Sequence, residues 1–415
     1  MLNSGNTAFM IICTGMVLFM TIGLSFFYGG FVRRKNVLNT MMSSISLIGL
    51  SITMWICIGY SLSFGGNNLG IIGSFKWIFL NGVGLGLAEY GQETAIPHLL
   101  FAAFQMMFAV ITPAIITGAI AGRMKFKALF IFMAVWSVIV YYPMAHMVWG
   151  EGGFLAELGS VDFAGGNVVH IASGVSALVL SLFLGTRRDY EVGEHRPHNI
   201  PFIVLGAGIL WFGWFGFNSG SALAANGLAV HALMTTAISS GIAMLSWMLI
   251  EVVLQKKATI VGAVTGGVVG LVAITPGAGF VPIWAALIIG ALVSPICYFS
   301  VAVIKKKFGY DDTLDAFGCH GIGGIWGGIA TGIFAHTEIN PLAKWNGLIF
   351  GDSGLFFAQV LSILITIMFA VVGTCICVGI VRIFTKLRVS SRDERMGLDI
   401  SEHGESAYPS FNGID

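Results

Sequence analysis

Charged residues are scarce in this sequence. Asp, Glu, Lys and Arg make up 10% of its 415 residues, whereas a typical soluble domain holds about 25%. Hydrophobic residues make up 56%. This balance excludes a soluble protein with an ordinary core and indicates an integral membrane protein. The formal net charge of +1 does not identify a partner, and we expect no nucleic acid to bind.

The cysteines are also too few and too scattered to build a metal centre or a disulfide framework. All six cysteines lie inside apolar runs, at no metal-ligand or disulfide spacing. Cys319 stands beside His320, but neighbouring positions on a helix face different directions. We therefore expect no metal site, no cofactor and no disulfide framework.

What the chain does have is long apolar stretches. Eleven of them are long enough to cross a hydrocarbon core of about 30 Å. They lie near 8–31, 38–63, 97–121, 128–149, 166–185, 201–223, 228–254, 258–275, 281–304, 314–334 and 353–385. The first is too long for a signal-peptide core, and no basic residue precedes Arg33. The sequence predicts an all-α integral membrane protein with eleven transmembrane helices.

The Lys and Arg residues predict the orientation. Only Lys76 and Lys344 of the 21 lie in loops that follow the even-numbered stretches or precede the odd-numbered ones. The others follow the odd-numbered stretches, which the positive-inside rule places at the cytoplasm. The N-terminus is then outside and the C-terminus inside, with the chain in the cytoplasmic (inner) membrane.

Two segments share a spacing. Asp162 precedes His170 by eight residues, and Asp312 precedes His320 by eight. Five predicted helices separate them, so the two units run in opposite directions, as in inverted repeats with a transport site between them. We expect repeats at about 8–185 and 201–334, a transmembrane domain over 1–385 that ends in a long eleventh helix, and a cytoplasmic tail over 386–415.

The two histidines should lie near the middle of the membrane. Each is roughly six to eight residues past its helix start, about 9–12 Å at 1.5 Å per residue. An ionisable side chain at that depth is a functional hypothesis by default, and desolvation favours neutral imidazole. Neutral rings can hydrogen-bond to each other. The alternative is that each bonds a helix carbonyl and only packs; a facing pair favours function.

Asp162 has two compatible interpretations. It is a good helix N-cap before the AGG that follows it. Its charge could also stabilise a nearby cation.

Aromatic residues mark the outer end. FAAFQMMFA places Phe104 and Phe108 one helical turn apart, AHMVWG ends in Trp149, and WFGFNSGSA holds Trp214, Phe217 and Ser221. These side chains could form an interfacial belt and lipid-facing packing, or a cation–π site with a hydroxyl acceptor. Composition alone leaves both open.

These stretches, with DFAGGNVVHI and DAFGCHGIGGIWG, resemble the ammonium transporter (Amt/Rh) family on its bacterial Amt side. The resemblance runs from FMIICTGMVLFM to the tail GLDISEHGESAY. It implies an outer ammonium recruitment site of Phe108, Trp149 and Ser221 with Asp162 near it, and a phenyl gate of Phe108 and Phe217. It implies a pore lined by His170 and His320, with Trp214 and Thr275 beside it.

The resemblance also implies partners. The family assembles as homotrimers with one pore per subunit and takes methylammonium as an analogue. The tail is similar to the segment involved in docking PII signalling proteins, through positions matching Gly397, Asp399, His403, Gly404 and Tyr408. The family's FQxxFA motif is kept, with Met106 and Met107 at its centre.

The expected function is ammonium uptake across the membrane, and not an enzymatic reaction. Ammonium would be recruited outside and deprotonated, and ammonia would pass the histidines with separate proton transfer. The alternatives are an ammonium sensor, a neutral gas channel for ammonia or carbon dioxide, and a membrane enzyme. The enzyme would need further ligands or acids near the histidines, and the sequence offers none there.

Overall fold

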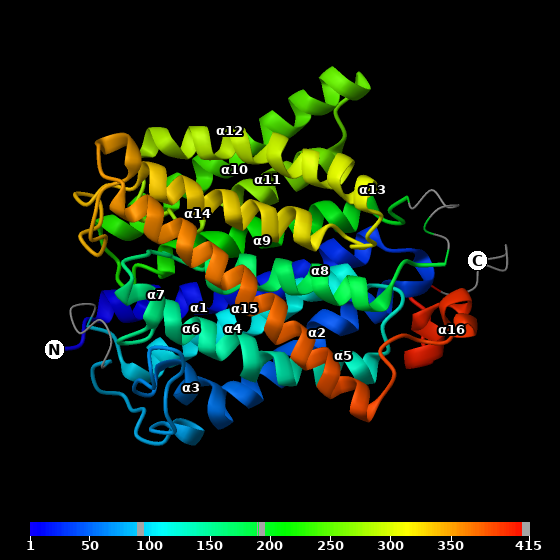
Figure 1. The fold of residues 1–415 in the computed structure, drawn as a ribbon, viewed down its shortest axis with the longest axis horizontal. Coiled ribbons are helices and arrows are strands. Elements are labelled where there is room, and N and C mark those ends of the chain that lie inside the picture. Colours follow the sequence, from blue (N-terminus) through cyan, green and yellow to red (C-terminus); the bar gives the residue numbers. More distant parts are fainter. Residues whose placement is uncertain (89–94, 189, 191–195, 409–415) are drawn as a thin grey trace.

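The computed structural model describes residues 1–88, 95–188, 190 and 196–408. Every regular element in these residues is a helix, and the long helices lie side by side along the long axis of the molecule (Figure 1). The N-terminus lies at one end of the bundle, and the helix α16 of the tail lies at the other (Figure 1). Within a helix, the backbone polar groups away from the two ends are satisfied inside the same segment, as a membrane requires.

The first half of the chain forms five helical rods, some containing a π-helical segment; the label η marks π-helices and, for η1, η3 and η9, 3₁₀ helices. They are α1 (Ser4–Phe31), α2 to α3 through η2 (Val37–Met54, Trp55–Gly59, Tyr60–Phe64), α4 (His98–Ile120), α5 to α6 through η5 (Phe126–Trp136, Ser137–Tyr141, Tyr142–Trp149) and η6 with α8 (Gly166–Ile171, Ala172–Leu184).

The second half supplies the remaining rods. They are α9 (Ile200–Gly220), α10 (Gly227–Gln255), α11 (Ile260–Ile274), α12 to α13 through η7 (Ile283–Phe299, Ser300–Ile304, Lys305–Phe308), η8 with α14 (Phe317–Gly321, Ile322–Phe334) and α15 (Gly354–Phe384). Short helices occupy the loops and the tail: η1 (Arg34–Asn36), η3 (Ile78–Leu80), α7 (Phe154–Glu157), η9 (Leu348–Phe350), α16 (Ser391–Met396) and η10 (Asp399–His403).

Within the described ranges, nine helices are long and apolar enough to cross a membrane. The protein is therefore a multi-pass membrane protein. The two other expected stretches, 258–275 and 314–334, hold the shorter apolar helix α11 and the joined helix η8–α14. The count of eleven spans, their orientation and the repeat boundaries stay predictions.

Glycine brings the two histidine-bearing segments into backbone contact. A Cβ added to Gly174 in α8 would overlap the backbone of Gly321 at the end of η8. Gly324 lies similarly against His170, where an added Cβ would come within 3.0 Å of the histidine Cβ. Small residues allow such close approach between membrane helices, and here the approach sets the spacing between the two histidines.

Candidate functional site

Each histidine segment begins under an aspartate that binds its free backbone N–H groups. The carboxylate of Asp162 accepts hydrogen bonds from the N–H groups of Gly165 (2.8 Å), Gly166 (2.6 Å), Asn167 (2.7 Å) and Val168 (3.4 Å). The carboxylate of Asp312 accepts two, from Ala316 (3.1 Å) and Phe317 (2.7 Å). The capping role predicted for Asp162 is confirmed, although the residue at the helix boundary itself is Gly165, with a positive φ of 123°.

The two imidazoles meet inside the protein. Nδ1 of His320 lies 3.2 Å from Nδ1 of His170, and the ring centroids are 5.3 Å apart at an interplanar angle of 25°. One Nδ1 must donate and the other accept, because a neutral imidazole has one nitrogen of each kind. The sequence therefore paired the correct histidines, 150 positions apart.

Trp214 and Thr275 hold the pair from the side. The indole ring of Trp214 stacks on His170 at 5.3 Å and 20°, and its N–H donates to Oγ1 of Thr275 at 2.9 Å. The indole N–H is thereby occupied, so Trp214 presents its apolar face to the imidazoles.

A narrow cavity runs beside the histidines. Its free space is about 10 Å³ for the centre of a water-sized sphere, close to what one water molecule needs. Apart from His170 and His320, its walls are apolar or aromatic: Met20, Leu24, Phe27, Ile111, Ile115, Val169, Leu210, Trp214, Phe217 and Val268. Such a cavity admits one small molecule at a time and offers a bare cation little compensation.

The predicted outer aromatic residues form one cluster above this cavity. Phe108 stacks against Phe217 with centroids 4.4 Å apart, and meets the ring of Trp149 edge-on at 5.6 Å. Phe217 in turn lies 6.2 Å from His170, so aromatic rings continue from Trp149 down to the histidines. Phe104 packs on Phe108 at 5.1 Å, as their one-turn spacing predicted.

Polar groups border this cluster. The hydroxyl of Ser221 donates to the Phe217 carbonyl at 2.9 Å, and its oxygen can still accept. The indole N–H of Trp149 donates to the backbone carbonyl of Asp162 at 2.9 Å. Asp162 thus orients Trp149, while its own carboxylate faces backbone N–H groups.

The inner end opens into a wide vestibule. Its free space, by the same measure, is about 870 Å³, and it extends from His320 to the loops and tail at the opposite end of the molecule from the N-terminus. Basic residues outnumber acids in its wall: Arg33, Lys35, Arg187, Arg188, Arg196, Lys305 and Arg395 face Glu251, Asp315 and Glu394. The wall of the space beyond His320 is therefore charged and mostly basic, unlike the apolar wall of the cavity beside the histidines.

The predicted tail residues lie away from the pore, against the loops. Oδ1 of Asp399 accepts the backbone N–H of Asn39 at 2.8 Å, and Nε2 of His403 lies 3.0 Å from Nδ2 of the same asparagine. The hydroxyl of Tyr408 lies 3.0 Å from Nε2 of His198. Gly397 and Gly404 have positive φ values of 108° and 71°. Residues 409–415 of the expected tail lie outside the described residues.

The sequence did not identify most of the pore wall. Ile115, Leu210 and Val268 resemble any other buried apolar residue, so no signal distinguished them. Two buried polar supports were also missed: Gln359, whose Oε1 accepts the Val161 N–H at 2.8 Å, and Asp311, which pairs with arginines. Asp311 could have been suspected, because it is a second acid beside Asp312. No three His, Cys, Asp or Glu side chains gather as a metal site in the part of the chain described.

Comparisons with known proteins identify the family of this chain. The model of the Ammonium Transporter Family matches residues 8–408. The chain is 49% identical over 404 residues to the ammonium transporter of Bacillus subtilis, covering 97% of this chain and 98% of that one. Its fold matches the crystal structure of Saccharomyces cerevisiae Mep2 with a TM-score of 0.87 at 33% identity, over 94% and 88% of the two chains.

A structure named Sensor Amt Protein also matches, with a TM-score of 0.88 at 28% identity, over 96% of this chain and 98% of that one. The sequence-based expectation of a transporter rather than an enzyme is confirmed by these names and by the family model. This chain belongs to the ammonium transporter family.

Proposed function

We propose that this transporter takes up ammonium by recruiting the cation outside and conducting neutral ammonia past His170 and His320. The observation that carries the proposal is the change of surroundings along one line: an aromatic cluster, then a cavity about 10 Å³ in free space, then a vestibule about 870 Å³ in free space. Ammonium transport itself follows from the family. The route and the form of the substrate are what we propose.

Recruitment would use the outer cluster. A cation over the faces of Trp149 and Phe108 gains cation–π attraction of about 0.5–2 kcal/mol, and the Ser221 oxygen can accept one of its N–H groups. The buried carboxylate of Asp162, 8% exposed as a residue, adds negative charge nearby without contacting the cation. The stacked rings of Phe108 and Phe217 separate this site from the cavity below.

Selection would follow from desolvation. The idealised cost of moving a monovalent ion into a medium of low dielectric is about 20 kcal/mol. Ammonium can avoid this cost by leaving its proton outside and crossing as ammonia, whereas potassium cannot. His170 and His320 would then offer a donor and an acceptor to ammonia without a fixed charge. The proton crosses separately, so net transport carries charge.

Further parts of the proposal concern topology and partners. The Lys and Arg pattern supports eleven spans with the N-terminus outside, a transmembrane domain over 1–385 built from inverted repeats, and a location in the cytoplasmic membrane. The like-capped segments at Asp162 and Asp312 support the repeats. We also propose a homotrimer, and a PII protein as the partner of the tail, in keeping with the family resemblance.

The test is a current recording on proteoliposomes given an ammonium pulse. We expect a sustained inward current that scales with protein content and is absent from protein-free liposomes. Uptake of ammonium without a current would support a neutral ammonia channel instead. No uptake and no current would contradict transport and would favour an ammonium sensor. The sensor is the second candidate function, because the fold also matches the structure named Sensor Amt Protein.

A further inference from the structure

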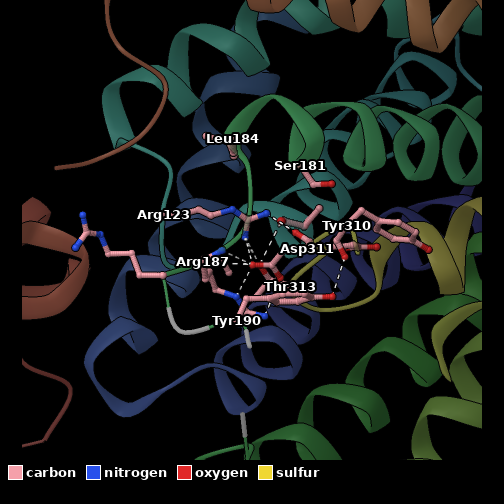
Figure 2. Close-up of polar contacts among 12 residues, drawn as sticks. Arg123, Ser181, Leu184, Arg187, Tyr190, Tyr310, Asp311 and Thr313 are labelled. Carbon is pink, nitrogen blue, oxygen red and sulfur yellow. Dashed lines mark hydrogen bonds and ion pairs between the residues drawn. The ribbon is translucent and has the colours of Figure 1, made fainter. Parts of the chain in front are cut away.

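The segment that carries His320 begins beside a buried cluster of ions. Three loops distant in the chain meet there, and Figure 2 shows the side chains of Arg123 and Arg187 converging on Asp311. Arg187 contributes its backbone N–H, Nε and Nη2, each 2.8 Å from a carboxylate oxygen of Asp311. Nη1 of Arg123 lies 3.7 Å from Oδ2 of the same carboxylate.

Arg123 also binds the backbone and side chains of the loop. Its guanidinium donates to the carbonyl of Asp311 and to the hydroxyl of Thr313. The backbone N–H of Leu314 donates to the carbonyl of Gly118 at 3.1 Å. Residues 311–314 are thereby fixed against the end of α4 by contacts to both side chain and main chain.

Two of the three charged side chains in this cluster are fully buried, and the third, Arg187, is 17% exposed. The side chains of Arg123 and Asp311 are both 0% exposed. Burial would raise the pKa of Asp311, but its hydrogen bonds and charge interactions with Arg187 and Arg123 outweigh burial and hold the pKa below its usual value. Burial lowers the pKa of Arg123 to about 10, so both groups are charged at neutral pH. Buried charges are tolerated only in well-paired geometry, which restricts where the loop can lie.

The next residue transmits that restriction to the pore. Asp312 follows Asp311 directly, and its carboxylate accepts the first free N–H groups of the segment, from Ala316 and Phe317. His320 lies one turn further, with its Nδ1 at 3.2 Å from His170. A hydrogen bond of this length is lost within a few tenths of an ångström, so a small shift of the loop would separate the two imidazoles.

We propose that Asp311, clamped by Arg123 and Arg187, is a positioning residue that sets the contact of His320 with His170 and thereby the selectivity of the pore. The inference rests on the proposed function of the histidine pair. It assigns the cluster a role in conduction beyond holding three loops together.

A double-mutant cycle tests this coupling. Asp311→Asn and His320→Ala are made singly and together, and the ratio of methylammonium to potassium uptake is measured per amount of folded protein in proteoliposomes. Asp311→Glu serves as the conservative rescue. Glu402→Gln is the control, because the Glu402 carboxylate accepts the backbone N–H of Phe126 at 2.9 Å and so holds the tail to the start of α5, and Glu402 is not among the wall residues of the cavity or the vestibule.

We expect Asp311→Asn to lower the ratio about fivefold, Asp311→Glu to restore part of it, and Glu402→Gln to leave it within twofold. In the His320→Ala background, Asp311→Asn should have no further effect, because residues that act through one another are not additive. An unchanged ratio in Asp311→Asn, or an equal loss in both backgrounds, would overturn the inference. If His320→Ala alone leaves the ratio intact, it is the proposed histidine pore that fails.

Discussion

The outer and inner histidine segments use the same cap but different supports. Each begins with an aspartate that binds backbone N–H groups, and each carries a histidine eight residues later. Neutral side chains of α15 hold the outer segment: the Gln359 side chain accepts the Val161 N–H. The Ser362 hydroxyl accepts a hydrogen bond from Nδ2 of Asn167 at 2.8 Å. Ions hold the inner segment, where Arg123 and Arg187 bind Asp311 and Nζ of Lys305 lies 2.6 Å from the Asp312 carbonyl.

This difference shows which feature is common to both segments and which depends on the end of the molecule where the segment begins. Helix geometry requires a cap wherever a segment starts inside the protein, so the aspartate recurs. Support comes from whatever lies nearby. The outer segment packs against the transmembrane helix α15, which α8 and α14 also contact. The inner segment lies beside loops that carry most of the basic residues, so ion pairs are available there.

Removing the caps should give the largest effects and should rank the two segments. Asp162 accepts four backbone hydrogen bonds and Asp312 two. Bonds to a charged group contribute about 1.5–3 kcal/mol each. Allowing for incomplete additivity, we expect Asp162→Ala to lower the free energy of unfolding by about 4–6 kcal/mol and Asp312→Ala by about half of that. Thermal unfolding of both variants in one detergent compares them; equal losses would contradict the ranking.

The ionic support at Asp311 and the neutral support at Gln359 should differ in how their contribution to stability depends on pH. Removing one partner of a buried ion pair costs about 3–5 kcal/mol, and we expect this of Asp311→Asn. Because its arginine partners hold the pKa of Asp311 below the ordinary value of 3.8, its contribution to stability is complete above that value and is lost as pH falls through the lower folded pKa. The difference in Tm between the protein and Asp311→Asn should be constant from about pH 7 to pH 5 and shrink below about pH 4.

Gln359→Met is the matched variant for the neutral support. It removes the acceptor of the Val161 N–H with little change in volume, and we expect a loss of about 1–3 kcal/mol. Since no ionisable group is removed, its difference in Tm should not change over the same pH range. A pH-dependent difference for Gln359→Met, or a constant one for Asp311→Asn, would remove the distinction between the two supports.

The positions of the long helices could be predicted from the sequence. The stretch 97–121 corresponds to His98–Ile120, and 353–385 to Gly354–Phe384. Agreement is this close because the hydrocarbon thickness sets the length of an apolar run. The π-helical segments η6, which carries His170, and η8, which carries His320, could not be predicted. Hydropathy does not distinguish an α-helical turn from a π-helical turn.

The polar part of the site could be predicted, and its supports could not. His170 and His320 stand out because ionisable residues are rare at that depth. Their contact with each other followed from the repeat. In contrast, Asp311 and Arg123 are 188 positions apart, and each looked like an ordinary loop charge. Sequence analysis used Arg123 only to predict the orientation in the membrane, because its partner depends on how three loops meet.

The histidines themselves allow a further comparison of the two segments. We expect His170→Ala and His320→Ala each to lower the ratio of methylammonium to potassium uptake about tenfold, or about 1.4 kcal/mol. His170 should have the larger effect, because His320 already borders the wide vestibule. His231→Ala is the control: this histidine lies in α10 and bonds the Val281 carbonyl at 2.8 Å, away from the pore. Intact selectivity in both pore variants would contradict the paired filter.

We expect the smallest effect on transport from a substitution in the aromatic cluster at the outer end. This cluster contrasts with the basic vestibule at the inner end. Trp149→Leu removes a cation–π contact worth about 1 kcal/mol, so we expect about a fivefold rise in the ammonium concentration for half-maximal uptake, with the maximal rate within twofold. Trp284→Leu is the matched control, because Trp284 in α12 is 43% exposed and packs on Phe334. Unchanged uptake at low ammonium in Trp149→Leu would show that capture of the cation does not depend on the aromatic cluster. The chemical difference between the two ends would then have no role in capture.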